Sequence, residues 1–93
     1  MKPFDWNEQK NQWLIRERDV CFEQVVLSIE NGKLLDVIQH PNPDKYIRQQ
    51  VYVIDIEGYA YMVPFVEEDD VIFLKTIFPS RKYTNIYLKK ESS

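Results

Sequence analysis

The spacing of apolar residues divides the chain into a helical first third and a remainder that forms strands. Segment 6–18 begins next to Asp5 and Glu8, which have the spacing of a capping box, and it carries a narrow apolar stripe. In segment 22–30 apolar residues recur at positions i, i+3, i+4 and i+7, and Gly32 follows as a helix stop. The pattern therefore predicts two helices, of which the second is better buried.

From residue 34 the apolar period changes from 3.6 towards 2, which is the period of β-strands. The Glu57–Gly58 pair predicts a tight hairpin, and Pro64 within a strand indicates an edge or a bulge. Near the C-terminus, Ser80 is placed to cap a short last helix. The strands predicted from this pattern span residues 34–38, 46–56, 59–66 and 71–78.

The order of these elements predicts an α+β fold with two N-terminal helices, a four-stranded, mainly antiparallel sheet and a short C-terminal helix. The short connections favour a meander for the last three strands. With 93 residues, of which 44% are apolar, the chain has enough material for one core. We therefore expect a single domain over residues 1–93.

Charge is distributed unevenly along the chain. Residues 1–70 hold 7 Lys or Arg and 14 Asp or Glu, a charge of −7, whereas residues 71–93 hold 5 and 1, a charge of +4. The net charge of −3 disfavours non-specific nucleic-acid binding by the whole surface, but it leaves a positive field at the C-terminal end. Function that involves a polyanion is therefore expected at that end.

Several classes of site and location are disfavoured by composition. One cysteine and one histidine, Cys21 and His40, are too few for the usual zinc site, so no metal or cofactor is expected. The single cysteine favours a reducing compartment, and no apolar stretch approaches the roughly 20 residues of a membrane span. We expect a cytoplasmic protein.

Alternation within strand 71–78 gives a first constraint on the basic residues. It assigns Lys75 to the face opposite the residues that the helices would cover, close to Arg81 and Lys82. In the preceding long strand, Arg48 shares a side with Gln50 and Tyr52. The set expected to face the helices is Ile72, Leu74, Thr76 and Phe78.

Cations interleaved with tyrosines have the composition of an RNA-binding surface, because cations meet phosphates and aromatic rings stack on bases. Such a surface can also cleave RNA without a metal, if a 2′-hydroxyl attacks the adjacent phosphate while Lys and Arg stabilise the developing charge. The alternative is that these are solvated charges and packing tyrosines. The candidate catalytic residues are Lys75, Arg81, Arg48 and Tyr83, and the candidate RNA-binding residues are Lys82, Tyr87 and Lys89.

Three short motifs resemble those of one family. The first helix opens with Phe4, Trp6, Asn7 and Lys10, the second with Val20, Phe22 and Glu23, and the closing basic motif holds Arg81 and Lys82. Over about residues 4–88 the chain resembles BrnT-type toxins in these motifs. The resemblance implies a RelE-like fold, cleavage of RNA that arrests translation, and a ribbon-helix-helix antitoxin as partner, with operator DNA bound only through that antitoxin.

The chain also differs from the common pattern of this family. Glu17, Arg18 and Asp19 occupy the turn where the family commonly has Lys-His-Gly, and Pro79 and Ser80 precede Arg81 where the family often has Ser-Ala. The alternative hypothesis is therefore a non-catalytic relative that acts as an interaction module and binds a ribbon-helix-helix partner.

Overall fold

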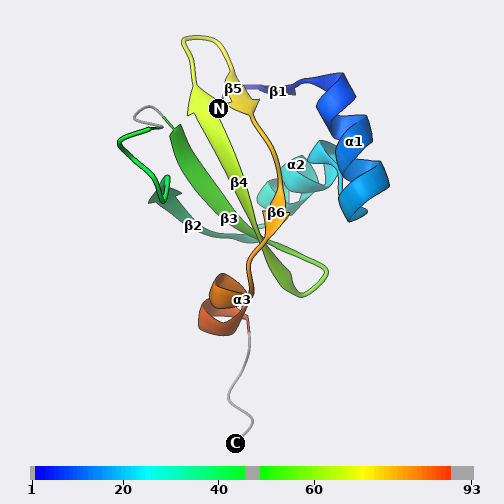
Figure 1. The fold of residues 1–93 in the computed structure, drawn as a ribbon, viewed down its shortest axis with the longest axis vertical. Coiled ribbons are helices and arrows are strands. Elements are labelled where there is room, and N and C mark those ends of the chain that lie inside the picture. Colours follow the sequence, from blue (N-terminus) through cyan, green and yellow to red (C-terminus); the bar gives the residue numbers. More distant parts are fainter. Residues whose placement is uncertain (1, 46–48, 89–93) are drawn as a thin grey trace, which may run out of the picture.

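The computed structural model describes residues 2–45 and 49–88, which form three helices and one mixed sheet (Figure 1). The helices pack on the sheet, which agrees with the predicted α+β class. The strands are β1 (Phe4–Trp6), β2 (Leu34–Gln39), β3 (Gln49–Ile56), β4 (Tyr59–Glu67), β5 (Ile72–Leu74) and β6 (Phe78–Pro79). The helices are α1 (Glu8–Arg18), α2 (Phe22–Glu30) and α3 (Arg81–Tyr87).

The sheet has the strand order β1-β5-β4-β3-β2, and β6 pairs with β4 beyond the end of β5. Only the β1–β5 pairing is parallel, so the prediction of a mainly antiparallel sheet is confirmed. The prediction of four strands is wrong. The sheet gains β1 at one edge, and the predicted last strand is divided into β5 and β6.

The first helix begins two residues later than predicted, because Phe4–Trp6 forms the strand β1. The first helix begins at Glu8, and the side chain of Asn7 caps it by accepting a hydrogen bond from the Lys10 amide at 2.9 Å. Asp5, the predicted cap, instead accepts from the amide of Trp6. The Trp6 ring stacks on Phe22 with centroids 5.5 Å apart, and this long-range packing holds β1 in place.

The second helix is as predicted at both ends. The Cys21 amide donates to the Gln24 side chain at 2.9 Å, which satisfies one free amide at the start. At the other end, Gly32 has φ of +76°, and the amides of Gly32 and Lys33 donate to the carbonyls of Ile29 and Ser28. This is a Schellman motif, which requires the left-handed conformation that glycine adopts without strain.

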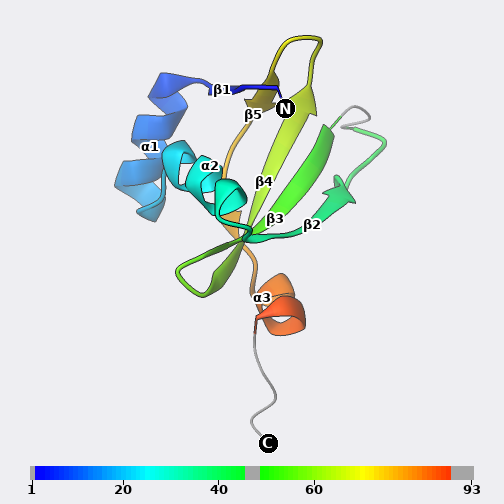
Figure 2. The ribbon, with the colours of Figure 1, turned by 180° about the vertical axis from the view of Figure 1, so that it is seen from behind.

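Both faces of the sheet bury apolar side chains. The face under α1 and α2 packs against Leu14, Phe22 and Val25 of the helices, with sheet residues Ile54, Ile56, Val63, Phe65, Ile72 and Leu74. Figure 2 shows α2 lying across this face. The opposite face buries a second group, which consists of Val51, Val53, Ala60 and Met62. Helix α3 packs against β4 on this second side.

The last strand is interrupted at Pro64 of β4. Lys75 donates its amide to the Pro64 carbonyl at 2.8 Å, but proline has no amide to return the bond, and the pairing of β5 ends there. The partners then change from Phe65 with Leu74 to Met62 with Phe78, which inserts one extra residue on the outer strand.

This insertion makes the predicted alternation correct before Lys75 and wrong after it. Ile72 and Leu74 face the helices as expected. Ile77, which was expected on the opposite side, is fully buried in the same core, and Phe78 pairs with Met62 on the opposite face. One extra residue reverses every later side chain of a strand.

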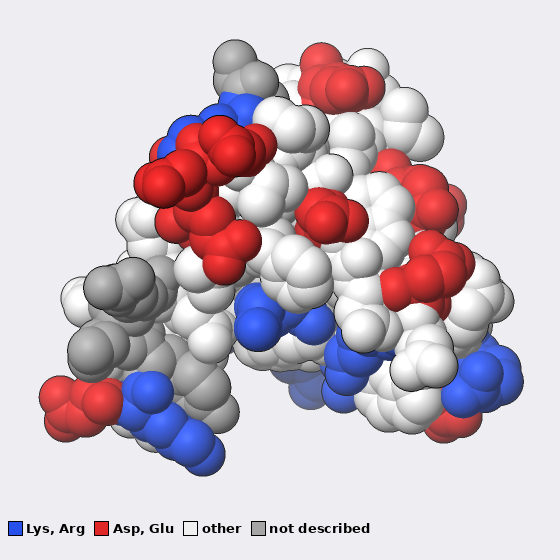
Figure 3. Space-filling model, turned by 90° about the horizontal axis from the view of Figure 1, so that it is seen from above, with Lys and Arg blue, Asp and Glu red and all other residues white. Residues whose placement is uncertain are grey.

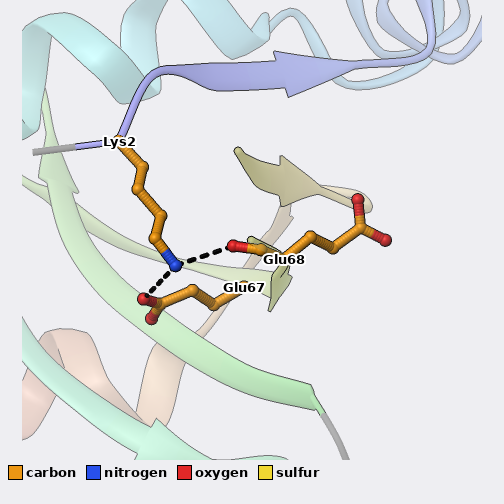
Figure 4. Close-up of polar contacts among 3 residues, drawn as sticks. All are labelled: Lys2, Glu67 and Glu68. Carbon is orange, nitrogen blue, oxygen red and sulfur yellow. Dashed lines mark hydrogen bonds and ion pairs between the residues drawn. The ribbon is translucent and has the colours of Figure 1, made fainter. Parts of the chain in front are cut away.

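An ion pair fastens the N-terminus to the turn between β4 and β5 (Figure 4). Lys2 donates from Nζ to the Glu67 carboxylate at 2.9 Å and to the Glu68 carbonyl at 2.7 Å. Both charged side chains are partly exposed, so the pair contributes at most about 1 kcal/mol to stability. Within residues 2–45 and 49–88, no helix is long and apolar enough to cross a membrane.

Candidate nucleic-acid interface

Helix α3 carries most of the candidate site, and it is fixed to the start of β4. Ser80 caps the helix by accepting from the Tyr83 amide at 3.1 Å, as predicted. The Thr84 hydroxyl accepts from the Ala60 amide at 2.8 Å and donates to the Ser80 carbonyl at 2.7 Å. These bonds set the rotation of α3 about its axis, and therefore the directions of its basic side chains.

The first two residues of α3 present their cations on different sides of the helix. Arg81 is exposed and lines a cavity of about 500 Å³ between α3 and the β3–β4 hairpin. Lys82 is also exposed, and its Nζ lies 5.5 Å from the ring centroid of Tyr83. The helix therefore offers one cation beside a cavity and another beside an aromatic ring.

Two tyrosines of α3 form a stacked pair. The rings of Tyr83 and Tyr87 have centroids 6.0 Å apart and an interplanar angle of 17°. The Tyr87 hydroxyl donates to the Asp36 carboxylate on β2, and this hydrogen bond raises the pKa of the Tyr87 phenol above its usual value. Tyr87 is therefore poorly suited to act as a base at neutral pH, but the residue remains 40% exposed.

Lys75 lies where β5 ends, on the sheet face away from α1 and α2. Its side chain is exposed, and its Nζ lies 5.4 Å from the ring centroid of Phe73 on the same face. The backbone amides of Lys75 and Ser80 donate to carbonyls four residues apart on β4, those of Pro64 and Ala60. At roughly 3.3 Å per residue, about 13 Å separates the Lys75 backbone from the start of α3.

Charges are partly segregated on the end of the molecule that carries the β4–β5 turn, which is the end opposite α3. In this view (Figure 3), Asp and Glu lie mostly over the upper part, and Lys and Arg mostly over the lower part. Among the described residues, Lys75, Arg81 and Lys82 have no carboxylate partner within ion-pair distance, in contrast to Lys2. Cations without such partners are available to phosphate.

Two candidate residues, Arg48 and Lys89, lie outside the described residues. The strand residues that were expected to share a side with Arg48 face the helices: Tyr52 stacks on Phe65 in the core, with centroids 3.9 Å apart. The structure thus brings together on α3 the C-terminal candidates Arg81, Lys82, Tyr83 and Tyr87. The backbone of Lys75 lies about 13 Å from the start of this helix, measured along β4.

Sequence reasoning missed three residues of this surface. Asn85 is one helical turn from Arg81 and lines the same cavity, so helical spacing alone was sufficient to find it. Tyr59 lines the cavity from the hairpin, and Asp36 binds Tyr87 from β2. These two contacts are long-range and have no local pattern in the sequence.

Other chemically active groups give no competing site in the part of the chain that the structure describes. No cluster of three His, Cys, Asp or Glu residues in that part is arranged to hold a metal ion. Partial burial raises the pKa of the Cys21 thiol, which disfavours the thiolate needed for nucleophilic attack.

Comparison with known proteins adds no relative to this description. No family model, no curated protein and no solved structure matches the chain.

Proposed function

We propose that the chain is the toxin of a type II toxin–antitoxin pair, with a RelE-like fold, and that it cleaves RNA without a metal ion. The observation that carries the proposal is the edge between Lys75 and Arg81, where exposed cations without carboxylate partners in the described chain lie beside aromatic rings. Single-stranded RNA is bound by surfaces of this composition, because cations neutralise phosphates and rings stack on bases.

The proposed reaction needs charge stabilisation and proton transfer. The 2′-hydroxyl loses its proton and its oxygen bonds to the adjacent phosphorus. The bond from phosphorus to the 5′-oxygen breaks, that oxygen takes up a proton, and a 2′,3′-cyclic phosphate remains. Arg81 and Lys75 stabilise the negative charge that builds on the phosphate oxygens. Lys82 or Tyr83 binds the strand or moves protons, whereas Tyr87 binds through its ring because its hydroxyl is held by Asp36.

The motifs shared with BrnT-type toxins supply the remaining parts of the proposal. A ribbon-helix-helix antitoxin neutralises the toxin in the cytoplasm, and operator DNA is bound only through that antitoxin. Arg48 remains a candidate catalytic residue that stabilises the phosphate charge, and Lys89 remains a candidate RNA-binding residue. The two exposed α3 side chains Ile86 and Tyr87, at 58% and 40% exposure, are available for contact with the antitoxin.

Tightly induced expression tests the proposal. We expect the wild-type chain to arrest growth and to reduce intact mRNA within minutes, and Arg81→Ala and Lys75→Ala to remove both effects. Lys33→Ala is the matched control, since Lys33 is an exposed lysine at the α2–β2 turn. Circular dichroism and thermal melts of each purified variant show whether the fold is retained. Arrest that survives in both Arg81→Ala and Lys75→Ala contradicts this assignment of the site.

The exposed apolar residues favour a second candidate, a non-catalytic module that binds a ribbon-helix-helix partner. Leu27 of α2 and Ile86 of α3 are 57% and 58% exposed, so both aliphatic side chains are available for contact with a partner. Absence of growth arrest from a folded wild-type chain, together with tight binding to a small DNA-binding protein encoded beside it, supports this candidate.

A further inference from the structure

The cavity beside Arg81 is open to solvent and has the volume of a small-ligand site. Its volume is about 500 Å³, which lies within the usual range of roughly 300–1,000 Å³ for such sites. It is lined by one face of α3 and by the turn of the β3–β4 hairpin. These two elements lie at the same end of the molecule (Figures 1 and 2). The lining residues are Gly58, Tyr59, Arg81, Thr84, Asn85 and Leu88.

Two polar side chains of this lining remain available to a ligand. The Thr84 hydroxyl already accepts from Ala60 and donates to Ser80, so it fixes the wall and offers little to a ligand. The Arg81 guanidinium and the Asn85 amide are exposed and have no hydrogen bond to another described residue. The cavity thus combines one cation with one group that both donates and accepts hydrogen bonds.

The remaining lining is suited to a flat ring. The Tyr59 ring is half-buried and is held edge-on to Tyr61 with centroids 5.9 Å apart, and Leu88 adds an aliphatic surface. Gly58 has no side chain, and nothing lies within 4 Å of the position that a Cβ would take, so the hairpin side of the cavity is open. Aromatic and aliphatic walls with one amide are what a nucleobase needs for stacking and edge recognition.

We propose that this cavity binds one base of the RNA strand, with adenine preferred, while Arg81 holds the adjoining phosphate. The inference rests on the proposed function, and it adds a specificity residue to it. Asn85 selects adenine because a carboxamide can accept from the N6 amino group and donate to N7 at the same time. Uracil offers a donor and an acceptor only to an amide in the reversed orientation, and cytosine, which can pair through N4 and N3, has a single ring and a smaller stacking surface than adenine.

Binding of short labelled RNAs tests the proposal. Fluorescence anisotropy is measured with the hexamers of adenylate, uridylate and cytidylate, for the wild type, Asn85→Ala, Asn85→Asp and Arg81→Ala. We expect the wild type to bind the adenylate hexamer about tenfold more tightly than the uridylate hexamer, with the cytidylate hexamer between the two. Asn85→Ala removes this preference and leaves binding of the uridylate hexamer nearly unchanged. Asn42→Ala, a change of an exposed loop asparagine, keeps the preference.

The variants separate a failure of the base site from a failure of the proposed function. Arg81→Ala is expected to weaken binding of all three hexamers by a similar factor, because a phosphate contact carries no sequence information. Asn85→Asp retains the shape but loses the donor, so it is expected to lose the adenine preference as Asn85→Ala does. Equal wild-type binding of all three RNAs, weakened by Arg81→Ala, overturns the base site alone. Absence of RNA binding overturns both proposals.

Discussion

Replacement of Asn11 by alanine is expected to destabilise the fold more than its polar character suggests. Asn11 lies on α1 with only 1% of its surface exposed. Its side-chain oxygen accepts from the Phe22 amide at 2.8 Å, and its amide donates to the Glu23 carboxylate at 2.9 Å. The Phe22 amide is one of the free donors at the start of α2, and Asn11 is the acceptor that satisfies it.

The size of this destabilisation depends on which groups lose their hydrogen-bond partner when Asn11 is replaced. Without Asn11, the buried Phe22 amide has no acceptor, which costs about 1–3 kcal/mol. Loss of the bond to Glu23 costs less, about 0.5 kcal/mol, because that carboxylate is exposed to water. The better helix propensity of alanine returns about 0.5 kcal/mol. The free energy of unfolding is therefore expected to fall by about 2 kcal/mol.

Urea unfolding of Asn11→Ala, followed by circular dichroism, measures this change. With a urea dependence of roughly 1.5 kcal/mol per molar, the midpoint is expected to fall by about 1.3 M. Gln12→Ala is the matched control, because Gln12 is an exposed neighbour whose side chain donates only to Glu8. Its free energy of unfolding is expected to change by less than about 0.5 kcal/mol. A midpoint for Asn11→Ala equal to that of Gln12→Ala refutes the reasoning.

Three further predictions concern other contacts. The hydrogen bond from Asn11 lowers the pKa of Glu23 in the folded state from its usual 4.5. A carboxylate with a lowered pKa stabilises the fold at pH values above its pKa in the unfolded chain, and this stabilisation is lost as the pH falls through its pKa in the folded protein. In urea melts, the difference in stability between the wild type and Asn11→Ala is therefore expected to shrink over that pH range. Gly58→Ala is expected to cost about 1 kcal/mol in thermal unfolding, because Gly58 has φ of +86° in a type I′-like turn. Asp36→Asn is expected to lower the pKa of Tyr87, and an unchanged tyrosinate absorbance titration contradicts the hydrogen bond between these two side chains.

Short sequence signals correctly predicted the helix ends and the turn that depend on interactions between residues close in sequence. Gly32 marked the end of α2, Ser80 marked the start of α3, and the Glu57–Gly58 turn has φ above zero at both residues. Each of these depends on a conformational preference or a cap within one turn of chain. The start of α1 was misplaced because Phe4–Trp6 is held extended by β5 and by Phe22, and neither partner is close in sequence.

The candidate interface shows the same division between local and long-range causes. Alternation placed Lys75 correctly, because it continues the pattern of β5 up to the Pro64 carbonyl. The position of α3 depends on the extra residue after that point, which pairs Phe78 with Met62 on the sheet face away from α2. The sequence around Pro64 predicted an edge or a bulge. The extra residue does not lie in the strand that contains Pro64, however, but between β5 and β6, which pair with that strand. The spacing of about 13 Å between the Lys75 backbone and the start of α3 is therefore set by the pairing of β4 with both strands, and no local feature of residues 71–88 specifies it.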